Sequence, residues 1–153
     1  MEIRPSGKYF DEFKIGEKFI TPSRTVTEAD IVNFAGISGD FNQVHTDEEF
    51  AKKLPFKGRI AHGLLTLAIA SGLTSRLIEG TAIAFLGQTN KFLGAVKPGD
   101  TITCYVEIAD KKEGKKPDRG IVFFKWIVKN QRQEPVMEAE FQLMMACSPA
   151  SRK

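Results

Sequence analysis

Apolar and polar residues alternate with a period of two through much of the second half of the chain, as in half-buried strands. Residues 120–128 differ, because they are apolar on both faces of the expected strand. The strands predicted from these patterns cover residues 18–26, 82–93, 101–109, 120–128 and 136–147. Turn-forming residues at 97–100 and a polar loop at 130–133 separate them, so we expect an antiparallel meander.

Helical periodicity dominates the first half of the chain. Thr27, with the acid Asp30 three positions later, predicts an N-cap and a helix that ends near Ser38. A second start is expected at Thr46, with Glu49 closing a capping box, and this short helix should end before Pro55.

Residues 63–78 form a third helical stretch that is apolar nearly all round, so we expect it to be buried on most sides. Helices that precede the strands, instead of alternating with them, indicate the α+β class. One antiparallel sheet against one helix leaves edge strands exposed, and dimerisation by sheet pairing would cover one of them.

Length and composition narrow the choice further. The 153 residues suit a single domain, 1–153, and the net charge of +3 is too small to indicate nucleic acid. Cys104 and Cys147 are isolated, which favours a reducing compartment. The start of the chain lacks the apolar stretch of a signal peptide, and residues 63–78 are shorter than the roughly 20 apolar residues of a membrane span. We therefore expect a cytoplasmic protein with no membrane partner.

Only two histidines are present, and His45 shares a seven-residue loop with Asp40 and Asn42. An acid and an imidazole five positions apart could converge on one water as an acid–base pair. The helix expected at Thr46 would keep the His45 ring neutral through its positive end, whereas Asp40 would act in the opposite sense. Turn capping by Asp40 and an Asx turn at Asn42 are the structural alternatives.

Gly63 opens the apolar helix, so its backbone N–H could hold a carbonyl oxygen that gains negative charge. Tight packing is the alternative reason for a glycine here. His62 is expected to be structural. Although Asp40, His45, Asp47 and His62 could form a metal site, they lack the i, i+4 histidine spacing of helical sites, so no metal is expected.

Residues 38–45 (SGDFNQVH) and 61–63 (AHG) resemble the MaoC-like dehydratases, which include the (R)-specific enoyl-CoA hydratases. The similarity runs from about residue 13 to about residue 147. It implies a single hot-dog fold, in which an antiparallel sheet wraps around a long central helix. The family usually has proline where this chain has Gln43, and we expect the loop to be less rigid here.

The resemblance implies reversible hydration of trans-2-enoyl-CoA to (3R)-3-hydroxyacyl-CoA. Asp40 and His45 would activate the water, and the Gly63 N–H would hold the thioester oxygen. The implied substrate-binding residues are Asn42, Ser71, Lys91 and Lys97. Asn42 would orient the loop or the water, Ser71 would line the acyl pocket, and the lysines would meet the phosphates of coenzyme A. No cofactor is implied, since coenzyme A arrives with the substrate, and the protein would form a homodimer or an assembly of dimers.

Three other functions stay open at this stage. An acyl-CoA thioesterase would deliver water to the carbonyl carbon instead of C3. A non-catalytic acyl-CoA-binding protein would tolerate replacement of Asp40. A dehydratase could also act on acyl chains attached to a carrier protein.

Overall fold

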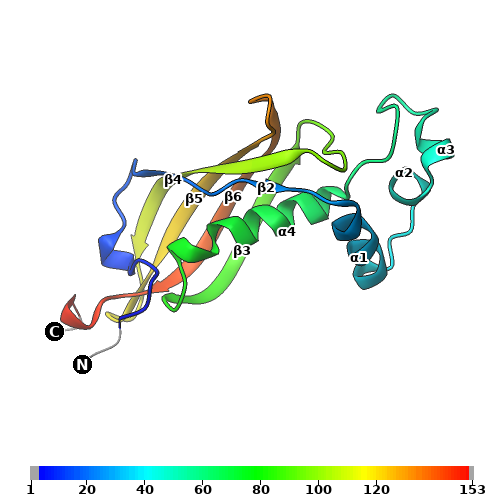
Figure 1. Cartoon of the computed structure of the whole chain (residues 1–153). Coiled ribbons are helices and arrows are strands. Elements are labelled where there is room, and N and C mark those ends of the chain that lie inside the picture. The colour runs from blue at the N-terminus through cyan, green and yellow to red at the C-terminus, as the bar shows by residue number, and fades with distance from the viewer. Residues whose placement is uncertain (1–3, 152–153) are drawn as a thin grey trace.

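An antiparallel sheet curves along one long helix, α4, and three smaller helices gather beyond one end of it (Figure 1). This computed structural model describes residues 4–151; the ends of the predicted 1–153 domain lie outside the described residues. The strands are β1 (Lys18–Ile20), β2 (Arg24–Thr25), β3 (Ala82–Phe92), β4 (Thr101–Glu113), β5 (Arg119–Lys129) and β6 (Pro135–Ala146). The helices are α1 (Glu28–Ser38), α2 (Gln43–Thr46), α3 (Glu48–Ala51) and α4 (Gly63–Thr74), with 3₁₀ turns at Phe10–Glu12, Ser75–Leu77 and Pro149–Ser151. The predicted α+β hot-dog arrangement is confirmed.

The sheet order is β1-β4-β5-β6-β3, with β2 also paired to β4. Strands β4, β5 and β6 form the predicted meander, but β3 crosses to the far edge and pairs with β6. The single strand expected over residues 18–26 is wrong, because it is split into β1 and β2. Pro22 has no N–H to donate to the ladder, so the pairing is interrupted there, and the Cys104 N–H donates to the Thr21 hydroxyl at 3.1 Å instead of to a strand carbonyl.

The core lies between α4 and the concave face of the sheet. Alternate residues of β4 are fully buried, as the period of two predicts, and Trp126 stacks on Phe141 with ring centroids 3.7 Å apart. Buried Leu65 and Ile69 bring α4 onto this face. Each such side chain contributes about 1.5–3 kcal/mol by leaving water.

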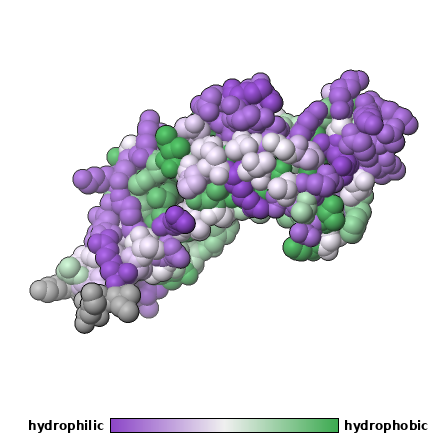
Figure 2. Space-filling view, viewed as in Figure 1, coloured by the Kyte–Doolittle hydropathy of each residue, from purple (hydrophilic) through white to green (hydrophobic). Residues whose placement is uncertain are grey.

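Helix α4 is less enclosed than its composition indicates. Leu64 is 61% exposed, and Ala68, Ser71 and Gly72 continue an outward stripe along the helix. Figure 2 shows hydrophobic surface along the lower border of the view, where β3 lies in Figure 1. Among the described residues, no helix is both long and apolar enough to cross a membrane.

Candidate active site

The turn that carries Asp40 begins where α1 ends. Thr27 and Asp30 form the predicted capping box at the start of α1, and Gly39, at φ +75°, ends it in the left-handed conformation. The Asp40 N–H donates to the Ser38 hydroxyl, and the Asn42 N–H donates to Asp40 Oδ1 at 3.1 Å. One carboxylate oxygen of Asp40 therefore stabilises the turn, and Oδ2 is left to face His45.

The helix starts after Asp40 differ from those expected. Asn42 caps α2 by accepting from the Val44 N–H, so its side chain orders the loop. Thr46 does not cap the next helix, because its hydroxyl donates to the Phe41 and Asn42 carbonyls, and Asp47 caps α3 instead. The expectation that His45 directly precedes a helix at Thr46 is wrong, since His45 lies within the single turn of α2.

The ring of His45 is fixed by one backbone contact. Its Nδ1 lies 2.8 Å from the Ile60 carbonyl oxygen, which can only accept, so Nδ1 carries the proton of the neutral ring. The unprotonated Nε2 then faces Asp40 Oδ2 at 4.0 Å. That separation is too long for a direct hydrogen bond but allows one water to contact both groups. The geometry suits removal of a proton from water.

His62 touches both members of this pair. Its ring stacks on His45 with centroids 3.8 Å apart, and its Nε2 lies 2.9 Å from the Asp40 carbonyl oxygen. Phe34 packs against the same ring at 5.0 Å. The side chain is buried, and Nδ1 has no hydrogen-bond partner among residues 4–151, which costs about 1–3 kcal/mol. Neither helical periodicity nor a capping pattern predicts these contacts.

Among residues 4–151, the side chains Asp40, His45 and His62 could also bring metal-ligating atoms within 4.8 Å of one another. The stacked rings are 29° from parallel, so their in-plane lone pairs do not converge well on one ion. Asp47, the fourth candidate ligand, caps α3. The expectation that no metal binds here stays a prediction.

A largely apolar cavity of about 310 Å³ joins His45 to the start of α4. Gly63 and Thr66 line it from α4, and Phe92 and Val136 line it from the sheet side. The Gly63 N–H is the first of α4 and has no acceptor within the helix. A Cβ at Gly63 would lie 2.8 Å from the Phe92 ring, so close packing also requires glycine here.

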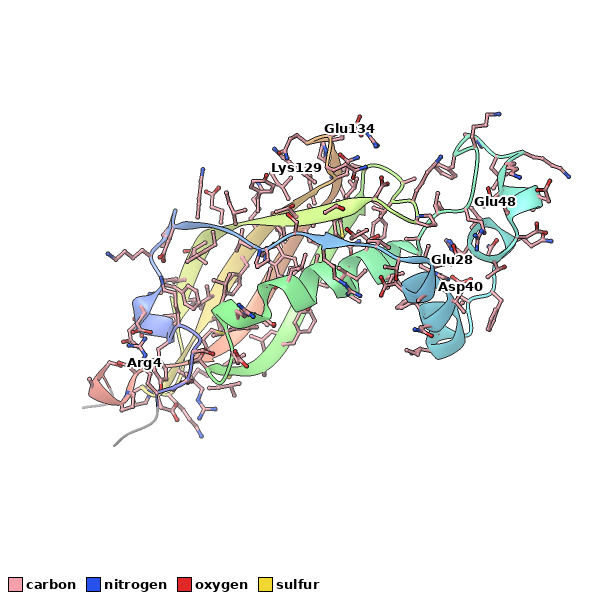
Figure 3. The ribbon with its side chains drawn as sticks, viewed as in Figure 1. Arg4, Glu28, Asp40, Glu48, Lys129 and Glu134 are labelled. Atoms are coloured by element: carbon pink, nitrogen blue, oxygen red, sulfur yellow. The ribbon has the colours of Figure 1, made fainter. Side chains whose placement is uncertain are left out.

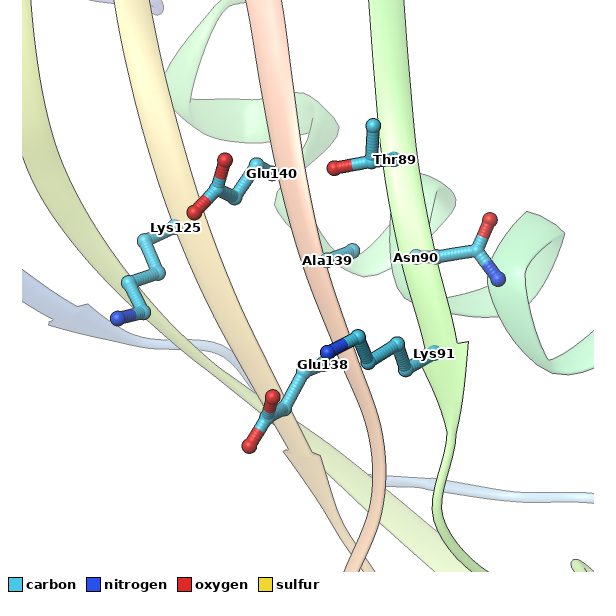
Figure 4. A pocket seen from close by; sticks show the side chains of 7 residues that line it. All are labelled: Thr89, Asn90, Lys91, Lys125, Glu138, Ala139 and Glu140. Carbon is cyan, nitrogen blue, oxygen red and sulfur yellow. The ribbon is translucent and has the colours of Figure 1, made fainter.

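The predicted substrate-binding residues fall in different places. Ser71 lines a second cavity of about 380 Å³ beside the later turns of α4. Lys91 lies in register with Glu138 on the sheet face away from α4, beside a groove that Lys125 and Glu140 also line (Figure 4). Lys97 is exposed and follows Val96, which lines the His45 cavity. The structure thus gathers Asp40, His45 and Gly63 and separates Lys91 from them.

Sequence reasoning missed a clamp behind His45. The Arg59 guanidinium binds Glu28 of α1 through two contacts, 2.5 and 2.9 Å, and its Nε lies 3.0 Å from Glu48 of α3. Figure 3 shows Glu28, Asp40 and Glu48 at the same helical end of the molecule. Hydrogen bonds from Arg59 hold the pKa of Glu48 below its usual value of 4.5. Arg59 directly precedes Ile60, so the clamp anchors the carbonyl that orients His45.

Comparisons with known proteins identify the family. The family model described as MaoC like domain matches residues 12–129. The chain is 45% identical over 101 residues to Protein MaoC of Klebsiella aerogenes, covering 65% of this chain but only 30% of that protein. It is 34% identical over 117 residues to an (R)-specific enoyl-CoA hydratase of Rhodospirillum rubrum, covering 76% of this chain and 78% of that protein.

Similarity to solved structures extends over nearly the whole chain. The crystal structure of a monoamine oxidase regulatory protein from Archaeoglobus superposes with a TM-score of 0.86 at 40% identity, covering 94% of this chain and 97% of that one. The matched family model spans the Asp40 turn, α4 and most of the sheet. The chain therefore belongs to the MaoC-like domain family.

Proposed function

We propose that this protein is a hydro-lyase that adds water reversibly to trans-2-enoyl-CoA to form (3R)-3-hydroxyacyl-CoA. The observation that carries the proposal is the 4.0 Å separation between His45 Nε2 and Asp40 Oδ2, in a histidine that lines one cavity with Gly63. The family includes the R. rubrum protein named an (R)-specific enoyl-CoA hydratase, which supports this reaction class.

The proposed reaction uses the positions of three groups, His45 Nε2, Asp40 Oδ2 and the Gly63 N–H. A water held between His45 Nε2 and Asp40 Oδ2 loses a proton as its oxygen bonds to C3 of the enoyl group. Electrons move from the C2–C3 double bond toward the thioester oxygen, where the Gly63 N–H stabilises the developing enolate. The proton taken from water then reaches C2 through the Asp40–His45 pair, so the net change is one water added. The low polarity of the cavity strengthens the Gly63 contact.

We assign the acyl chain to the cavity beside Ser71. Gly63 and Ser71 lie eight residues apart on α4, a rise of about 12 Å. The lining is mostly apolar, and the stacked rings of Trp126 and Phe141 form part of it. Lys97, next to the His45 cavity, is better placed than Lys91 to meet the phosphates of coenzyme A.

The active unit in this proposal is a homodimer joined along β3. This strand is a sheet edge, and Ile83, Phe85 and Leu86 on it are 43–58% exposed. A long apolar edge strand invites pairing with a second copy. The proposal requires no cofactor beyond the substrate's own coenzyme A, and the isolated cysteines favour the cytoplasm as its compartment.

Incubation with crotonyl-CoA tests the reaction. We expect loss of the conjugated enoyl-thioester absorbance without release of free thiol, and a product of (3R) configuration. Asp40→Asn and His45→Ala should each lower kcat by about 10² or more while the fold persists. Thiol release would instead identify a thioesterase. Binding without turnover, unchanged in Asp40→Asn, would identify an acyl-CoA-binding protein.

A further inference from the structure

We propose that His62 is a positioning residue that holds Asp40 and His45 in register with each other. The inference rests on the proposed function, since it takes Asp40 and His45 as the pair that activates water. The evidence for it is two contacts made by the ring of His62, a residue that is 2% exposed. Each contact reaches one member of the pair.

The first contact fixes the backbone of Asp40. The Asp40 carbonyl oxygen only accepts, so the 2.9 Å contact places the proton of the neutral His62 ring on Nε2. The Asp40 side chain is 52% exposed and needs support from its own backbone. A donor anchored at the start of the buried helix α4 supplies that support across 22 residues of sequence.

The second contact fixes the plane of His45. Stacking at 3.8 Å prevents the His45 ring from tilting toward His62, and the Ile60 carbonyl sets its rotation within that plane. Together they aim Nε2 at Asp40 Oδ2. A single rigid ring therefore couples the two halves of the site.

The unsatisfied Nδ1 of His62 argues against a purely stabilising role. An apolar side chain of similar size would fill this site without burying an unpaired acceptor. The presence of a histidine at position 62 is therefore better explained by its N–H donor and its flat ring face than by a gain in stability. If His62 were purely structural, its replacement should lower activity and stability together. If it positions the pair, activity should fall without a matching loss of stability.

Two substitutions separate the contacts. His62→Leu removes both the donor and the flat face, whereas His62→Gln retains an N–H donor that can reach the Asp40 carbonyl. Val122→Ala, in the fully buried part of β5 away from the site, is the control for loss of stability alone. Steady-state kcat and KM with crotonyl-CoA and the thermal unfolding midpoint are measured for all four proteins.

We expect His62→Leu to lower kcat by about 10²-fold with little change in KM and no loss in melting temperature. His62→Gln should recover much of the lost kcat, and Val122→Ala should melt lower but turn over normally. Full kcat in His62→Leu, or a kcat that falls only in step with melting temperature, would overturn the proposal.

Crystal structures of the wild type and His62→Leu give a readout that does not depend on turnover. The distance from Asp40 Oδ2 to His45 Nε2 should lengthen in the variant, and an unchanged distance would overturn the positioning role. If the wild type fails to hydrate crotonyl-CoA, the proposed function fails, while this distance still decides whether His62 positions the pair.

Discussion

At the scale of single residues, Gly63 satisfies two requirements at one position. Its N–H is free of helix bonding, and its Cα hydrogens face the Phe92 ring, where a Cβ would approach to 2.8 Å. Sequence reasoning presents these as alternatives, but the structure shows that they coexist. Substitutions can separate these two requirements because the Phe92 ring can move.

Gly63→Pro should lower kcat by about 10²–10³, because it deletes the N–H that holds the thioester oxygen in the proposed reaction. Gly63→Ala retains that N–H and only crowds Phe92, which is 49% exposed and can rotate outward. Gly63→Ala should therefore lose less kcat than Gly63→Pro. Adding Phe92→Ala should restore the kcat of Gly63→Ala but not that of Gly63→Pro. Kinetics of the four variants check this, and equal losses in kcat and substrate binding for Gly63→Pro would favour packing alone.

Gln43 occupies the first position of α2, where proline is well suited to a helix. Asn42 already has ψ 135°, the extended conformation that proline imposes on its predecessor. We expect Gln43→Pro to stabilise the fold by about 0.4–1 kcal/mol by restricting the unfolded chain. Thermal unfolding measures this. Val44→Pro is the matched control and should destabilise, because the Val44 N–H donates to Asn42 Oδ1.

At the scale of elements, short helices α2 and α3 depend on contacts from outside themselves. Four residues form too little of a helix to be stable alone. The Arg59 clamp binds the first residues of α1 and α3, so it holds α2 between two anchored elements. The stability that this clamp contributes depends on pH.

The pKa of Glu48 is depressed in the folded protein, chiefly by the hydrogen bond from the Arg59 side chain. The stability that this contact contributes is therefore present above the usual pKa of 4.5 and is lost as the pH falls through the lower folded value. Arg59→Gln should bring the Glu48 pKa back toward 4.5, as an NMR titration of the carboxyl group can show. An unchanged Glu48 pKa in Arg59→Gln would refute this cause. Glu134, held by Asn130 and Arg132, is the internal control and should titrate as in the wild type.

At the scale of the whole molecule, the two edges of the sheet differ. The β1 edge is three residues long, whereas β3 runs for eleven residues with apolar side chains exposed along it. A long unpaired edge of this kind is rarely left open in a soluble assembly. In the proposed homodimer, this asymmetry makes β3 the edge that joins the two copies.

Leu86→Glu should shift the protein from dimer to monomer, since it would place a charge in the apolar stretch of β3 that the proposed dimer buries. Sedimentation velocity measures the change. Ile20→Glu on β1 is the control, because Ile20 is 69% exposed at the opposite edge and should leave the dimer intact. If the dimer survives Leu86→Glu but dissociates in Ile20→Glu, the interface lies at the β1 edge and the prediction is wrong.

The sequence by itself determined the features that depend on neighbouring residues. The period of two in β4, the Thr27–Asp30 capping box and the start of α4 at Gly63 each follow from the pattern within a few positions, and all three are confirmed. The loop that holds Asp40 and His45 was likewise recognisable from its composition. Such local rules hold because each needs only one turn of helix or one pleat of strand.

Only the tertiary structure decided the features that depend on distant partners. His62 meets the Asp40 carbonyl from 22 residues away, and β3 pairs with the last strand instead of the next. Each is a choice among several locally acceptable partners. Packing makes that choice, because burying the ring or the strand edge favours one arrangement of the whole chain over the others.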